Sequence, residues 1–162
     1  YKDIIVKPIY GHGGAGVFRL KQDDSNLDSL LELFFSNSRE PVMVQAFLPA
    51  VSEGDKRIML VDGKAVGALN RRPKSGQVRS NLVVGGTAEK SDLSEADKRI
   101  CDAIGPELRQ RGLVLTGIDV IGGRLTEINV TSPTGVQAIK KLSGIDIPAI
   151  FWDSVQERLA GR

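Results

Sequence analysis

The stretch that decides the fold is KPIYGHGGAGVFRL, residues 7–20, which carries the spacing G-x-G-x-x-G at Gly11, Gly13 and Gly16. In a dinucleotide-binding turn this spacing follows a strand and opens a helix whose N-terminus holds the pyrophosphate. Residues 3–6 predict the strand, but residues 17–20 alternate apolar and charged side chains and predict a second strand. We therefore place the glycines in a β-hairpin loop, where backbone N–H groups can be donated to phosphates. A solvent-exposed glycine turn is the alternative for this segment alone.

Composition indicates one globular domain with a real core, because the 162 residues are 41% hydrophobic and 26% charged. A formal net charge of +2 gives no reason to expect nucleic-acid binding. We find no signal peptide and no apolar run of membrane-spanning length, so we expect no membrane partner. The single cysteine, Cys101, excludes an internal disulfide and suits a reducing compartment such as the cytoplasm. Because the chain begins almost directly on a strand, we expect it to be part of a longer protein.

The order of the expected elements indicates an α+β fold. Asp62-Gly63 predicts a tight hairpin between strands at 57–61 and 65–70. Ser94 with Asp97 resembles a capping box for a helix to about residue 111, which Pro106 should kink or split. We also expect strands at 42–45, 114–121 and 125–130, an amphipathic helix over 27–35 with Leu27, Leu30, Leu31, Phe34 and Phe35 on one face, and a last helix over 148–159 capped by Asp146.

The segment GIDVIGGRLTEINVTSPTG, residues 117–135, offers the oxygen ligands Asp119, Glu127 and Asn129 on two adjoining strands. Such ligands suit Mg²⁺, which binds through a few carboxylates and substrate phosphates. Glu127 and Asn129 share a face because they are two residues apart. Asp119 joins them only if it pairs opposite Glu127, which requires a three-residue loop or an equivalent bulge. Otherwise the three are solvated polar residues on a half-buried hairpin.

Taken together, the segments IIVKPIYGHGGAGV, VQAFLPA, GDKRIMLVDG, RSNLVVGG and GIDVIGGRLTEINVTSPTG resemble bacterial glutathione synthetase, an ATP-grasp ligase. The resemblance runs in matching order from the first strand to the last helix. It implies an ATP-grasp fold of antiparallel sheets with packed helices, in which nucleotide is held between two sub-lobes. We expect residues 1–47 to form the smaller lobe with the glycine hairpin and residues 48–162 the larger lobe. The family's N-terminal domain is expected to be absent from this chain.

The resemblance also implies a function, which is to join γ-glutamylcysteine to glycine with ATP through an acyl phosphate, using Mg²⁺ or Mn²⁺. Its implied ATP contacts are Lys7, Gly11, Gly13, Gly14, Gln45, Ala46, Phe47, Leu48 and Asp55. Its implied catalytic residues are Arg57, Arg79 and Asn81, and its implied metal ligands are Asp119, Glu127 and Asn129. Its implied substrate contacts are Arg71, Ser132, Pro133, Thr134 and Gly135. Residues 72–87 would form a lid that orders over the substrate.

Two other functions stay open on the sequence. One is another ATP-grasp carboxylate–amine ligase with a different acceptor, such as a ribosomal-protein glutamate ligase or a D-alanine ligase. The other is a nucleotide-binding module without turnover, because part of the family's substrate pocket lies in its N-terminal region. The resemblance implies a cytoplasmic, homo-oligomeric full-length enzyme, whereas we expect this chain alone to be inactive.

Overall fold

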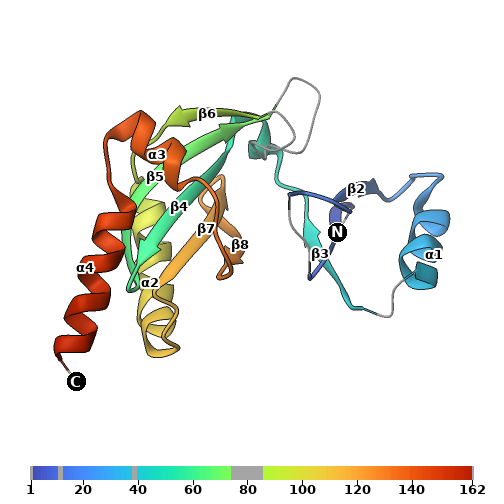
Figure 1. The fold of residues 1–162 in the computed structure, drawn as a ribbon. Helices are drawn as coiled ribbons and strands as arrows, with labels where there is room; N and C mark the ends of the chain where they lie inside the picture. The colour runs from blue at the N-terminus through green and yellow to red at the C-terminus, as the bar shows by residue number, and fades with distance from the viewer. Residues whose placement is uncertain (1, 11–12, 38–39, 74–85, 162) are drawn as a thin grey trace.

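The structure, a computed structural model, describes residues 2–10, 13–37, 40–73 and 86–161. Its strands form two separate antiparallel sheets (Figure 1). The three-stranded sheet has the order β2-β1-β3 and the five-stranded sheet has the order β6-β5-β4-β7-β8. The chain passes from the first sheet to the second once, after β3. The α+β class predicted from the sequence is confirmed.

The three-stranded sheet consists of β1 (Asp3–Pro8), β2 (Phe18–Lys21) and β3 (Val42–Ala46). β1 pairs antiparallel with β2 from Asp3–Lys21 to Val6–Phe18, which confirms the hairpin around the glycine loop. In that loop Gly13, Gly14 and Gly16 all have φ near +70°, a backbone conformation that glycine adopts without strain.

Helix α1 (Leu27–Asn37) covers the face of this sheet that points away from the five-stranded sheet (Figure 1). Phe34 packs edge-to-face on Phe18 with ring centroids 5.6 Å apart. Phe35 was expected on the same apolar face but is 62% exposed. It lies one residue, or about 100° of helix rotation, beyond Phe34 and so leaves the packed stripe.

The five-stranded sheet contains β4 (Asp55–Val61), β5 (Lys64–Arg72), β6 (Thr87–Lys90), β7 (Leu115–Ile121) and β8 (Arg124–Asn129). β4 and β5 meet at Asp62-Gly63, as predicted, and both turn residues have positive φ. Such a turn matches the right-handed twist of the strands that it joins.

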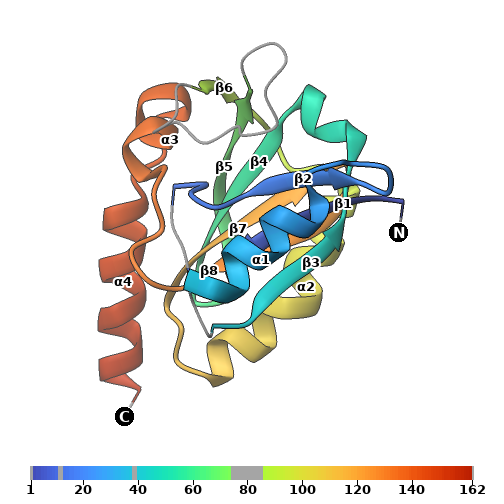
Figure 2. The same cartoon turned by 90° about the vertical axis from the view of Figure 1, so that its right-hand side faces the viewer.

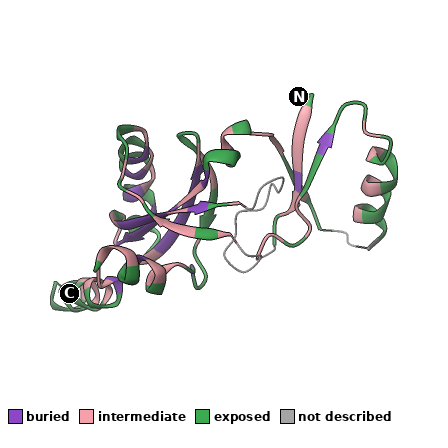
Figure 3. Ribbon diagram, turned by 90° about the horizontal axis from the view of Figure 1, so that it is seen from above, coloured by how far each residue is buried: buried purple, intermediate pink, exposed green. Residues whose placement is uncertain are grey.

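Alternate residues of this sheet pack into two apolar layers, and most of the buried residues lie on its strands (Figure 3). On one face Ile58, Leu60 and Ile118 lie under α2 (Glu95–Gln110), which adds its own Cys101 to the layer. On the other face Met59 and Leu69 lie under α3 (Val136–Ser143) and α4 (Ile147–Ala160). The larger part of the core therefore belongs to the five-stranded sheet.

Helix α2 begins as predicted, with the Ser94 hydroxyl accepting from the Asp97 N–H and the Asp97 carboxylate accepting from the Ser94 N–H. Of the kink or split expected at Pro106, the split is wrong, because α2 runs unbroken past it, and the kink stays a prediction. The preceding residue is Gly105, which has no Cβ for the proline ring to strike, and Pro106 itself is exposed.

Three short elements were not predicted: β6, α3 and the 3₁₀ helix η1 (Pro49–Glu53). The last helix was, and the Asp146 carboxylate caps it by accepting from the Ala149 N–H. Within the described residues, the helices are too short or too polar to cross a membrane.

Candidate functional site

The face of the five-stranded sheet that packs under α3 and α4 becomes charged toward one end. Arg57 lies two residues before Met59 on β4, and Arg71 lies two residues after Leu69 on β5, so both share the face of that apolar layer. Asp119 pairs with Arg57 across the β4–β7 ladder. All three residues are at most 5% exposed, so their charges can persist only if they are mutually satisfied.

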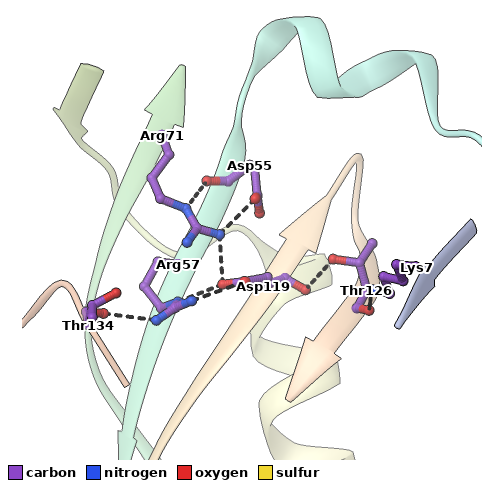
Figure 4. A network of polar contacts seen from close by, with 7 residues as sticks. All are labelled: Lys7, Asp55, Arg57, Arg71, Asp119, Thr126 and Thr134. Atoms are coloured by element: carbon purple, nitrogen blue, oxygen red, sulfur yellow. Dashed lines mark hydrogen bonds and ion pairs between the residues drawn. The ribbon is translucent and has the colours of Figure 1, made fainter. Parts of the chain in front are cut away.

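Asp119 satisfies both arginines (Figure 4). Arg57 donates Nε to Oδ1 at 2.6 Å and an Nη2 hydrogen to Oδ2 at 3.1 Å, which is a forked contact. Arg71 approaches Asp119 Oδ1 at 2.8 Å and donates to Asp55 Oδ2 at 2.7 Å. Burial alone would raise the pKa of Asp119, but the Arg57 hydrogen bond and the Arg71 charge outweigh it and hold that pKa below its usual range.

Arg57 also ties this network to the loop before α3. Its Nη1 donates to the Thr134 carbonyl at 2.9 Å. A Cβ on Gly117 would lie 2.8 Å from Pro133, so the loop packs directly on the β7 backbone. Ser132 and Gly135 take positive φ in this loop, and no side chain of the described residues caps the α3 N-terminus at Gly135. The loop therefore presents main-chain N–H groups of α3 beside the arginines.

The β7–β8 hairpin fulfils the register condition set by the sequence through a bulge. Ile121 pairs with Arg124 and Val120 with Leu125, which leaves a two-residue turn at Gly122-Gly123. The register then shifts so that Asp119 pairs with Glu127, and Thr126 is the extra residue. Asp119, Glu127 and Asn129 consequently share one face.

The same bulge joins the two sheets. Lys7 Nζ and Gln45 Nε2 both donate to the Thr126 carbonyl, at 3.2 and 3.3 Å. Viewed from the side of the three-stranded sheet, β1 and β3 lie in front of β7 and β8 (Figure 2). No sequence pattern singled out Thr126, although the bulge required by the register placed an extra residue somewhere in this hairpin.

Glu127 differs from Asp119 in its environment. Its side chain still reaches solvent, yet partial desolvation and the neighbouring Asp119 charge raise its pKa. Asn129, two residues on, has a buried Nδ2 without a hydrogen-bond partner among the described residues. An amide that turns over brings its oxygen to such a position, where a cation could satisfy it.

These groups fit a hard divalent cation with one qualification. Glu127 and Asn129 are available oxygen donors on one face, whereas both Asp119 oxygens already accept from arginines. A carboxylate keeps further lone pairs, so Asp119 can share a cation with them. Within the ranges described, no three His, Cys, Asp or Glu side chains gather into a metal site. A cation here would therefore rely on Asn129 and on phosphate oxygens.

The other predicted residues are placed as follows. Gly13 and Gly14 lie in the hairpin loop, Ala46 ends β3, and Phe47 and Leu48 follow it into the crossing between the sheets. Gly11, Arg79 and Asn81 lie outside the described residues, as does most of the expected lid at 72–87.

Comparison with known proteins finds a matching family and similar curated proteins. Residues 1–144 match the family described as prokaryotic glutathione synthetase, ATP-grasp domain. The chain is 56% identical over 156 residues to glutathione synthetase of Mesorhizobium japonicum, covering 96% of this chain and 50% of the relative. It is 54% identical over 158 residues to that of Brucella melitensis, covering 98% and 51%. The chain thus spans about half the length of these curated relatives.

Among solved structures the chain resembles D-cycloserine synthetase DcsG, with a TM-score of 0.73 and 18% identity, covering 98% of this chain and 56% of that one. It also resembles D-alanine–D-alanine ligase from Bacillus anthracis complexed with ATP, with a TM-score of 0.65 and 19% identity, covering 99% and 55%. At such identities the likeness shows the fold, which is ATP-grasp. The family match and the similar curated proteins lead to one conclusion: the chain belongs to the prokaryotic glutathione synthetase ATP-grasp domain family.

Proposed function

We propose that this chain is the ATP-binding part of a ligase that joins γ-glutamylcysteine to glycine. In the proposed reaction a carboxylate oxygen of the dipeptide attacks the γ-phosphorus of ATP and releases ADP. The glycine amine then attacks the acyl carbon and releases phosphate. Family membership supports this function, and the observation that carries it is the placement of Asp119 opposite Glu127, beside two buried arginines. This arrangement concentrates the charges needed to hold phosphates in place.

We further propose that residues 1–47 and 48–162 act as the two lobes, because each contains its own sheet. ATP would lie between them, with its phosphates at Lys7 and the glycine loop (Gly11, Gly13 and Gly14). Its adenine would lie against the main chain of residues 45–48, and Asp55 would receive the ribose. Lys7 already reaches across to the β8 bulge, so its ammonium can meet a phosphate held there.

Mg²⁺ or Mn²⁺ is the proposed metal, held by Glu127 and Asn129 with Asp119 as a shared ligand, and when bound it would neutralise phosphate charge. Arg57 is proposed as a catalytic group near the transferred phosphate, and it would also orient Asp119 and the loop at Ser132, Pro133, Thr134 and Gly135. That loop would receive substrate carboxylate groups through hydroxyls and α3 N–H groups. Arg71 is proposed as a substrate-carboxylate contact, and Arg79 and Asn81 as catalytic groups near the acyl phosphate. A cytoplasmic location and a homo-oligomeric full-length enzyme complete the proposal.

The second candidate function is nucleotide binding without turnover. Under both proposals the chain binds Mg-nucleotide, but only under the first does it make glutathione within a full-length protein.

Calorimetric titration with ADP and a non-hydrolysable ATP analogue, with and without Mg²⁺, tests the shared part. We expect Mg²⁺-dependent binding by wild type and weaker Mg²⁺-dependence for Glu127→Gln. Absence of nucleotide binding by a folded sample would contradict the proposal. A glutathione-forming assay on the full-length protein then separates the two candidates.

A further inference from the structure

The crossing between the two sheets is the segment 47–54, which links β3 to β4. Side chains on the face of the three-stranded sheet that points toward the five-stranded sheet contact the start of this segment. Arg19 pairs with Ile5 across β1–β2, and Ile5 pairs with Gln45 across β1–β3. Directly paired residues lie on the same face, so the Arg19 side chain shares the face of Gln45, whose amide reaches the five-stranded sheet. This face also carries Lys7, two residues after Ile5.

Arg19 reaches over β1 to the first residue of the crossing. Its guanidinium carbon lies 3.6 Å from the centroid of the Phe47 ring, a close cation–π contact. Its Nε and Nη2 donate to the two Asp3 carboxylate oxygens at 2.9 and 2.6 Å. The Asp3 carbonyl in turn accepts from the Phe47 N–H at 3.0 Å. Asp3 and Arg19 thus hold both the main chain and the ring of Phe47.

A plain surface ion pair is the simpler interpretation, because the Arg19 and Asp3 side chains are 35% and 33% exposed. Such pairs add little stability. An ordinary surface pair does not, however, hold both the main chain and the side chain of a third residue, as this pair does for Phe47. The two hydrogen bonds to Asp3 fix the orientation of the Arg19 guanidinium plane. Because the Phe47 ring stacks on that plane, its position is restricted too, and with it the start of the crossing.

We propose that Arg19 is a positioning residue that sets the main chain of residues 45–48 for the nucleotide base, acting through Phe47. The inference rests on the proposed function, in which this segment meets adenine. Arg19 does not touch the phosphate-binding side chains assigned above, so its loss should weaken recognition of the base and leave phosphate recognition intact.

The test compares ADP with tripolyphosphate, which has no base, in titrations with Mg²⁺ on the full 162-residue chain. Arg19→Met keeps the length of the side chain but removes its charge and its planar fork. We expect ADP to bind about two- to fivefold more weakly, the range for a partly exposed cation–π contact. Tripolyphosphate affinity should not change. Arg111→Met, which breaks the Arg111–Glu107 pair on α2, is the matched control and should change neither affinity.

A double-mutant cycle with Phe47→Leu tests the inference without relying on the Arg19→Met variant alone. Phe47→Leu keeps the main chain and removes the ring, so Arg19→Met should cause little further loss of ADP affinity in that background. Arg19→Lys, which keeps the charge without the fork, should recover part of the affinity. Unchanged ADP binding by Arg19→Met, equal losses for ADP and tripolyphosphate, or full additivity with Phe47→Leu would overturn the inference alone. A wild-type chain that binds no ADP would overturn the proposed function and this inference with it.

Discussion

Asp119 stands directly opposite Glu127 in the β7–β8 ladder, although the strands are joined by a two-residue turn. The extra residue Thr126 makes this possible and turns its own carbonyl toward Lys7 and Gln45. The two carboxyl groups share a face but differ electrostatically, since Arg57 and Arg71 hold the pKa of Asp119 low while that of Glu127 is raised.

Replacing Glu127 with Gln should stabilise the metal-free chain at neutral pH. The raised pKa means that the folded state binds the proton more tightly than the unfolded state, so stability falls as pH rises from the ordinary carboxyl range through the raised value. Urea denaturation of wild type and Glu127→Gln should show a gap that closes as the solution is acidified below that range. Saturating Mg²⁺ with ADP should reverse the order, and a pH-independent gap would contradict this assignment.

Replacing Asp119 with Asn should cost about 3–5 kcal/mol of unfolding free energy, because it leaves two buried arginines without their shared counter-charge. Since the wild-type pKa is depressed, the carboxylate contributes stability at neutral pH that is lost as pH falls through the folded value. Chemical denaturation at several pH values measures both effects. Glu89→Gln, which breaks the exposed Arg72–Glu89 pair, is the control and should change stability little.

Deleting Thr126 should preserve the facing of the two carboxylates and abolish the contact between the sheets. Without the extra residue, a regular ladder would bring Glu127 opposite Asp119, while Lys7 and Gln45 would lose their shared acceptor. We expect Mg²⁺-dependence of ADP binding to persist at reduced affinity in calorimetry. Loss of Mg²⁺-dependence in a folded deletion variant would show that the bulge is needed for more than register.

Changing Gly105 to Ala should destabilise the protein even though alanine is the better helix former. The new methyl would strike the Gly63 carbonyl, a backbone atom that cannot move aside. The clash should outweigh the propensity gain and lower the unfolding free energy by about 2 kcal/mol. Ala103→Gly, on the exposed side of α2, isolates the propensity effect, and a Gly105→Ala variant as stable as wild type would disprove the close approach.

Local chemistry explains which elements the sequence predicted. The Asp62-Gly63 turn and the Ser94–Asp97 capping box each depend on four residues or fewer, so the local sequence is enough to predict them. Pro106 does not split α2 because the effect of a proline depends on its neighbour, here Gly105. The site was predicted in part: residue spacing placed Glu127 and Asn129 on one face, but Asp119 joined them only if the hairpin contained a three-residue loop or an equivalent bulge. That bulge and the Arg19–Phe47 contact depend on tertiary packing, which the local sequence does not show.

The uneven distribution of the core has a consequence for local unfolding. In the three-stranded sheet and α1, Val6 and Leu20 are the only described residues that are fully buried, whereas the five-stranded sheet packs apolar layers on both faces. The β1–β3 amides should therefore exchange with deuterium through partial openings that leave β4 and β7 protected. A nucleotide bound between both sheets would slow that exchange, so the exchange rate of the β1–β3 amides would indicate how much of the protein has nucleotide bound.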